Sequence, residues 1–185
     1  MTLKELLSDR RAAIWRRWRD AILDTYPDRS AAFYKRETDR FANPVGQTIS
    51  EQTRGIVDAL IEGVEPEQLG PMLQPMVKIR AIQDFAPSLA IGFVFQLHEI
   101  VQQELAAELD NKENGARLDS ELRLFEATVQ RLALVAFDLY VGCREQVYEL
   151  RVNELKRNLH TLIRRVGNPA LPGDPALTGD PALTD

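Results

Sequence analysis

The stretch DSELRLFEATVQRLALVAFDLYVGCREQVYELRVNELKRNLHTLIRRV, from Asp119 to Val166, contains no proline and one internal glycine, Gly142. Such an uninterrupted run predicts a single long helix. Its apolar residues form two stripes that each step alternately by four and three positions. The first stripe is Phe125, Val129, Leu132, Ala136, Leu139 and Cys143, and the second is Tyr148, Val152, Leu155, Leu159, Leu162 and Val166. The jump from Cys143 to Tyr148 is five positions, so the second stripe lies on another face.

The two stripes predict two roles for the long helix. The first half is expected to cover a globular core, and the second to pair with another helix. Charged residues fill the other faces of the second half, and a lone helix with this stripe would expose a large apolar patch. We therefore expect a homodimer whose interface is Tyr148, Val152, Leu155, Leu159, Leu162 and Val166. The alternative is that this segment folds back on its own domain through a bend near Gly142.

The remaining chain also has helical patterning. Thr2 and Glu5 form a capping box, Pro44 suits the first turn of a helix, and Gly63 suits a helix end. Further helices are expected at residues 3–26, 28–41, 44–63, 76–85 and 88–109. The last of these is apolar on nearly all sides through Leu97, which predicts a central, buried helix. The predicted core centres on Leu89, Phe93, Leu97, Ile100, Leu132 and Ala136.

No stretch alternates between apolar and polar residues, so we predict an all-α fold without a sheet. We place one helical domain at residues 1–166. Residues 167–185 form a separate tail, GNPALPGDPALTGDPALTD, in which GDPALT repeats in tandem. Its regularly spaced prolines and glycines predict a disordered appendix without a packed core.

Composition narrows the classes of function. The chain has 23 basic and 28 acidic residues and a net charge of −5, which gives no support for nucleic-acid binding. The single cysteine excludes an intramolecular disulfide. The longest nearly apolar run, Phe85 to Leu97, is too short to span a bilayer. These features favour a cytoplasmic protein.

Motifs for catalysis are absent from the sequence, so we expect no enzyme, no catalytic residue, no cofactor and no metal site. Two residues keep alternatives open. His98 lies on the predicted central helix, where an axial haem ligand could sit, and Cys143 could serve a redox sensor. Each is also explained as an ordinary core or boundary residue.

A polar cluster is the candidate site for a small ligand. Arg80 and Asp84 are four residues apart and can pair on one helix face. Asp138, Arg144 and Glu145 surround the point where the apolar stripe shifts. A structural network of salt bridges explains these residues without a ligand. The alternative is a small polar ligand held between Arg80 and Arg144.

Three segments resemble one family. They are ANPVG (Ala42–Gly46), IRAIQDFAPSLAIGFVFQLHEIV (Ile79–Val101) and AFDLYVGCREQVYELRVNELKRN (Ala136–Asn158). They resemble the N-terminal sensor domain of RsbRD-type co-antagonists of the stressosome, a bacterial stress-signalling assembly. The resemblance implies a globin-like, dimeric sensor domain without haem, whose last helix leads to a STAS output domain. In this chain the repeat tail follows Val166, so we expect a stand-alone sensor domain.

Together these observations predict a non-enzymatic signalling or regulatory protein. It would act by binding a protein partner or a small effector. A small-ligand or haem-binding redox sensor is the alternative, although the resemblance implies a lysine where this chain has His98, which argues against haem.

Overall fold

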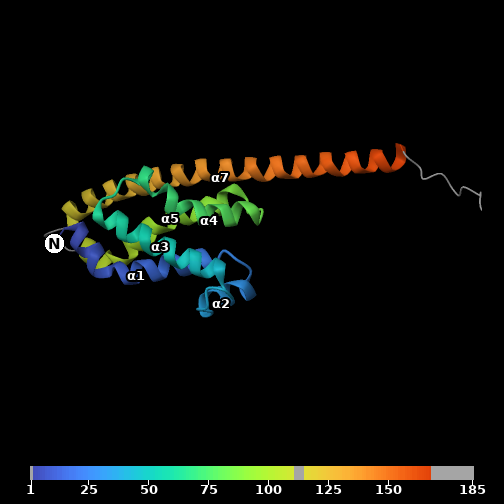
Figure 1. Cartoon of the computed structure of the whole chain (residues 1–185). Helices are drawn as coiled ribbons and strands as arrows, with labels where there is room; N and C mark the ends of the chain where they lie inside the picture. Colours follow the sequence, from blue (N-terminus) through green and yellow to red (C-terminus); the bar gives the residue numbers. More distant parts are fainter. Residues whose placement is uncertain (1, 111–114, 168–185) are drawn as a thin grey trace, which may run out of the picture. The chain divides into compact units, whose positions relative to one another are not determined.

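The computed structural model describes residues 2–110 and 115–167, and within those ranges it contains helices and no strand. The all-α prediction and the long C-terminal helix are confirmed (Figure 1). The elements are α1 (Leu3–Leu23), α2 (Asp28–Arg36), α3 (Pro44–Glu62), the 3₁₀ helix η1 (Pro66–Leu69), α4 (Gly70–Ile82), α5 (Pro87–Glu104), α6 (Ala106–Leu109) and α7 (Gly115–Gly167).

The chain divides into two compact units, residues 1–147 and residues 148–185. In the first unit α1 packs on α3 and α5, and α3 also packs on α4. The buried apolar side chains form one cluster that runs from Leu3 to Cys143, so this core belongs to the first unit. The second unit contains the end of α7. Residues 168–185 of the repeat tail lie outside the described residues, so the predicted tail and its boundary stay predictions.

Helix ends follow the local signals in the sequence. The capping box is formed, because Glu5 N donates to Thr2 Oγ1 at 3.3 Å and Thr2 N donates to Glu5 Oε2 at 2.8 Å. Asn43 caps α3, and Pro44 follows at its first position. Gly63 ends α3 with φ of 83°, a left-handed conformation that favours glycine.

Three of the predicted helices have different boundaries in the structure. The helix expected at residues 88–109 is interrupted at Leu105 and forms α5 and α6. The helix expected to begin at Met76 begins at Gly70, and Pro75 lies inside it. Pro71 sits near the helix start, where its missing N–H is not needed, and tertiary packing maintains the helix through Pro75. The helix expected at residues 28–41 ends at Arg36.

The predicted core is confirmed at five of its six positions. Phe93, Leu97, Ile100, Leu132 and Ala136 are buried, whereas Leu89 is 55% exposed. Leu89 lies in the first turn of α5, and its backbone carbonyl rather than its side chain reaches the interior. Trp18 is fully buried beside Phe93 and donates its indole N–H to the Phe93 carbonyl at 2.7 Å.

Candidate functional site

Arg80 is the one predicted site residue that lies in the core. It is fully buried on α4, and its guanidinium joins three elements. Nη1 donates to the Leu89 carbonyl at 2.6 Å, and Nη2 donates to the Ile22 carbonyl at 3.2 Å and to Thr25 Oγ1 at 2.7 Å. Arg80 therefore fixes the end of α1 and the start of α5 against α4.

The Arg80 charge is surrounded by aromatic rings. Its Cζ lies 5.5 Å from the Tyr26 ring centroid and 5.0 Å from those of Phe85 and Phe93. Arg80 pairs with no carboxylate within residues 2–110 and 115–167. Burial lowers the pKa of Arg80 and raises the pKa of the Tyr26 hydroxyl. Carbonyl oxygens and ring faces thus replace a counter-ion.

Asp84 and Arg144 form a separate contact at the corner between α4 and α5. Arg144 Nη1 pairs with the Asp84 carboxylate and donates to the Ala81 carbonyl at 3.3 Å. Asp84 has a φ of 62°, and aspartate is among the few residues that tolerate this left-handed conformation. Tyr140 adds a hydrogen bond of 2.6 Å from its hydroxyl to the Phe85 carbonyl. Two α7 side chains therefore hold this corner.

The other two predicted site residues, Asp138 and Glu145, are exposed on α7. The five residues are consequently divided among a buried cation, a corner contact and two surface carboxylates. A small polar ligand between Arg80 and Arg144 stays a prediction. No group of three potential metal-ligating residues occurs within the described ranges.

The two residues considered for redox chemistry have ordinary surroundings. His98 is half-buried on α5. Cys143 is buried, and burial raises the pKa of its thiol. A raised pKa disfavours the reactive thiolate form.

An apolar groove crosses the first unit between α5 and α7, and sequence reasoning missed it. It has a volume of about 500 Å³, and its walls include Ile91, Phe95, Leu134 and Phe137. Phe95, Leu134 and Phe137 are all exposed. α5, which was predicted to be a central, buried helix, therefore also has an exposed apolar face. The sequence did contain a signal for this groove, because α5 carries more apolar residues than a single buried face needs.

The predicted dimer stripe is exposed in the second unit. Tyr148, Val152, Leu155, Leu159 and Leu162 are between 46% and 68% exposed. The side chain of Val166 lies outside the described part. Exposed apolar residues at this spacing form a seam that can pair with another helix. We call Tyr148, Val152, Leu155, Leu159 and Leu162 the seam.

Comparison with known protein families identifies the family to which the chain belongs. The sequence model of the RsbT co-antagonist protein RsbRD N-terminal domain matches residues 12–155. The chain belongs to this family. An uncharacterised protein of Archaeoglobus fulgidus is 26% identical over 152 residues, which cover 78% of this chain and 84% of that protein. No solved structure matches the chain.

Membership in the RsbRD N-terminal family makes this a signalling domain related to the stressosome. The resemblance seen in the sequence is thereby confirmed, whereas a globin-like arrangement stays an expectation. Of the helices within the described ranges, none is both long and apolar enough to cross a membrane.

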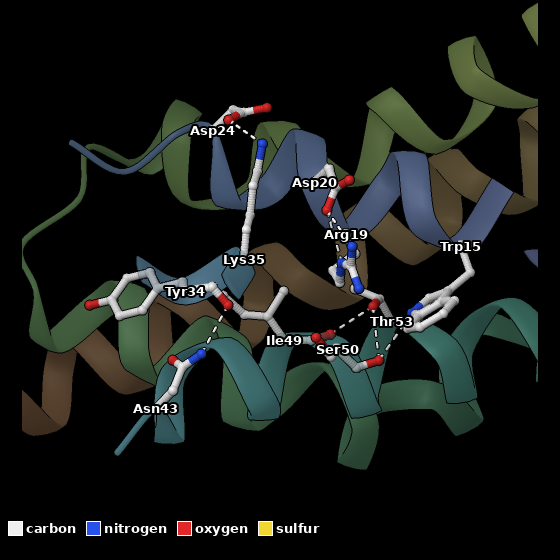
Figure 2. A network of polar contacts seen from close by, with 10 residues as sticks. All are labelled: Trp15, Arg19, Asp20, Asp24, Tyr34, Lys35, Asn43, Ile49, Ser50 and Thr53. Carbon is white, nitrogen blue, oxygen red and sulfur yellow. Dashed lines mark hydrogen bonds and ion pairs between the residues drawn. The ribbon is translucent and has the colours of Figure 1, made fainter. Parts of the chain in front are cut away.

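One segment behind the family resemblance has a clear structural role in this RsbRD domain. Asn43, in ANPVG, is fully buried. Its Nδ2 donates to the carbonyls of Tyr34 at 2.9 Å and Glu37 at 2.8 Å, and its Oδ1 accepts from Gly46 N at 2.8 Å. Figure 2 shows Asn43, the N-cap residue of α3, reaching to the Tyr34 carbonyl of α2. The segment thus joins the end of α2 to the start of α3.

Proposed function

We propose that this RsbRD domain is a non-enzymatic cytoplasmic signalling protein that acts as a homodimer and transmits its signal through a protein partner or a small effector. The observation that carries the proposal is the seam, which places exposed apolar side chains at coiled-coil spacing on the end of α7. In a symmetric dimer, the seam of each chain covers the seam of the other. Family membership supports the signalling role.

The seam fits two-stranded pairing in its residue types. Val152 is β-branched at one core position and Leu155 and Leu162 are leucines at the other, a combination that favours two strands, whereas Leu159 places a leucine at the position of Val152. The seam spans only about two heptads, and short helix pairs are marginal by themselves. We therefore infer that other surfaces of the chain, such as the α5–α7 groove, contribute to association with partners.

Light scattering of purified protein tests the dimer. The parent should have twice the chain mass, and Leu155→Glu with Leu159→Glu should reduce it to the chain mass, because burying glutamate in the seam costs more than the pairing provides. Leu150→Glu is a matched control, since Leu150 is 67% exposed and Leu155 is 68% exposed on the same helix. Leu150 lies off the seam, so its variant should remain dimeric. A monomeric parent, or a dimeric double variant, would refute the seam.

A further inference from the structure

A polar hollow of about 290 Å³ lies between α1, α2 and α3 in the first unit. Trp15 forms part of its wall, and its charged lining residues are Arg19, Lys35, Glu37, Glu51 and Arg54. Figure 2 shows Trp15 and Arg19 reaching from α1 towards α3. None of these residues belongs to the polar cluster predicted from the sequence.

Two guanidinium groups contact the same indole ring in this hollow. The Cζ atoms of Arg19 and Arg54 lie 5.2 Å and 5.5 Å from the Trp15 ring centroid. Trp15 is itself fixed, because its Nε1 donates to the Ser50 carbonyl at 3.1 Å. Arg19 is neutralised by Asp20, whose Oδ1 accepts from Nε at 2.9 Å and from Nη2 at 2.7 Å.

Arg54 has no such counter-ion. Within residues 2–110 and 115–167 it forms no ion pair and no hydrogen bond, and its contact is the Trp15 ring. Arg54 is exposed, so its charge is solvated by water and not paired with a carboxylate of the described residues. A carboxylate or phosphate group matches the donor geometry of a guanidinium and could displace this water to pair with Arg54.

The other charges limit which anion fits. Lys35 is paired with Asp24 at 2.6 Å, and Glu51 lies 3.6 Å from Arg40. Glu37 also lines the hollow, and its carboxylate accepts a hydrogen bond from the backbone of Asp39. Two carboxylates in the wall repel multiply charged anions, so a single negative charge fits best.

Neutral hydrogen-bonding groups complete the lining. The hydroxyl groups of Thr38 and Ser50 have no hydrogen-bond partner in the part of the chain that the structure describes. Both can donate to or accept from a ligand hydroxyl. The wall near Thr38 is held in place, since Gln47 Nε2 donates to the Thr38 carbonyl at 3.0 Å and Asn43 secures the adjacent loop.

We propose that this hollow binds a small hydroxylated monocarboxylate, whose carboxylate pairs with Arg54 beside Trp15 and whose hydroxyl group bonds to Thr38 or Ser50. The site goes beyond the proposed dimer and uses none of its seam residues. It provides an effector site on the first unit of the domain. The volume and the fixed walls suit a ligand of metabolite size.

Nuclear magnetic resonance of the full chain tests the site with L-lactate as the probe. The indole N–H signal of Trp15 should shift and saturate as lactate is added. The Trp18 indole is an internal reference, because it is fully buried and bonded to the Phe93 carbonyl. Propionate, which lacks the hydroxyl group, and inorganic phosphate should each bind at least about tenfold more weakly.

Two matched variants separate the site from general charge effects. Arg54→Gln should weaken lactate binding by at least about tenfold, because it removes the guanidinium that holds the carboxylate. Arg16→Gln changes the net charge equally at an exposed α1 residue outside the hollow and should leave binding unchanged. Circular dichroism of both variants should match that of the parent, which checks that they fold. An unmoved Trp15 signal, equal binding of phosphate, or equal weakening by both variants would overturn the proposal.

Discussion

Arg80 carries its charge in the core with carbonyl groups and aromatic rings as its neighbours. Arg80→Met would keep much of the side-chain volume but remove the hydrogen bonds to the Leu89 carbonyl, to Thr25 Oγ1 and to the Ile22 carbonyl, which still accepts from Thr25. We expect the free energy of unfolding to fall by about 2–4 kcal/mol, measured by urea denaturation. Arg16→Met, on the surface, should change it by less than about 0.5 kcal/mol. A variant as stable as the parent would show that burying the charge costs as much as its hydrogen bonds contribute.

Gly46 is required by close packing. A Cβ atom there would lie 2.4 Å from Asn43 Nδ2 and 2.6 Å from the Tyr34 carbonyl oxygen. Gly46→Ala should therefore disrupt the α2–α3 junction and cost about 1–3 kcal/mol in thermal or urea unfolding. Gly142→Ala is the matched control, because a Cβ at Gly142 meets no atom within 4 Å and the residue lies inside α7. That variant should gain up to about 1 kcal/mol from helix propensity. Equal effects of the two substitutions would contradict the predicted clash.

At the scale of the element, α5 presents one buried and one exposed face. Leu97 is 1% exposed and Leu89 is 55% exposed. Leu97→Ala should lower the free energy of unfolding by about 2–5 kcal/mol, because it leaves a cavity in the core. Leu89→Ala makes the same chemical change and should cost less than about 0.5 kcal/mol. Urea unfolding of both variants measures the difference, and similar losses would mean that the faces of α5 are assigned wrongly.

The start of α1 is joined to α7 by a carboxylate. Leu3 N donates to Glu121 Oε2 at 2.6 Å, and this backbone hydrogen bond holds the pKa of Glu121 below its usual value. A lowered pKa means that Glu121 stabilises the fold at neutral pH, and that this contribution is lost as the pH falls below about 4.3 through the folded-state pKa. Glu121→Gln should therefore flatten the acid side of a stability-against-pH profile. Identical profiles for parent and variant would count against this contact.

Local chemistry made much of the helical pattern predictable. The capping box at Thr2, the Asn43–Pro44 start and the Gly63 stop each depend on residues within a few positions, so the sequence shows them directly. The faces of the helices depend on distant packing. For that reason Leu89 was assigned to the core although it is exposed, and the α5–α7 groove was not foreseen.

The polar sites were harder to predict because their partners are far apart in the chain. Local spacing suggested that Arg80 pairs with Asp84, whereas the Asp84 carboxylate pairs with Arg144, sixty positions away. Arg80 instead bonds to carbonyls, which every residue carries and which no side-chain pattern reveals. The hollow at Trp15 also requires α1 and α3 to meet before Arg54 reaches the ring.

At the scale of the whole molecule, the core and the seam belong to different units. All residues of the buried apolar cluster precede Tyr148, whereas the seam begins at Tyr148. Shortening the chain should consequently remove dimer formation without preventing folding. A chain of residues 1–147 keeps the buried cluster, and a chain of residues 1–166 keeps the seam as well.

We expect residues 1–147 to fold with nearly the urea midpoint of the full chain, since the apolar area buried in the core is retained. Light scattering should show a monomer, because the seam is gone. Residues 1–166 should remain dimeric and equally stable, in line with a repeat tail that buries too little apolar area to contribute. A dimer of residues 1–147 would instead place the interface on the first unit, where Phe95, Leu134 and Phe137 form the exposed apolar groove. Loss of folding in residues 1–147 would show that the second unit supports the core.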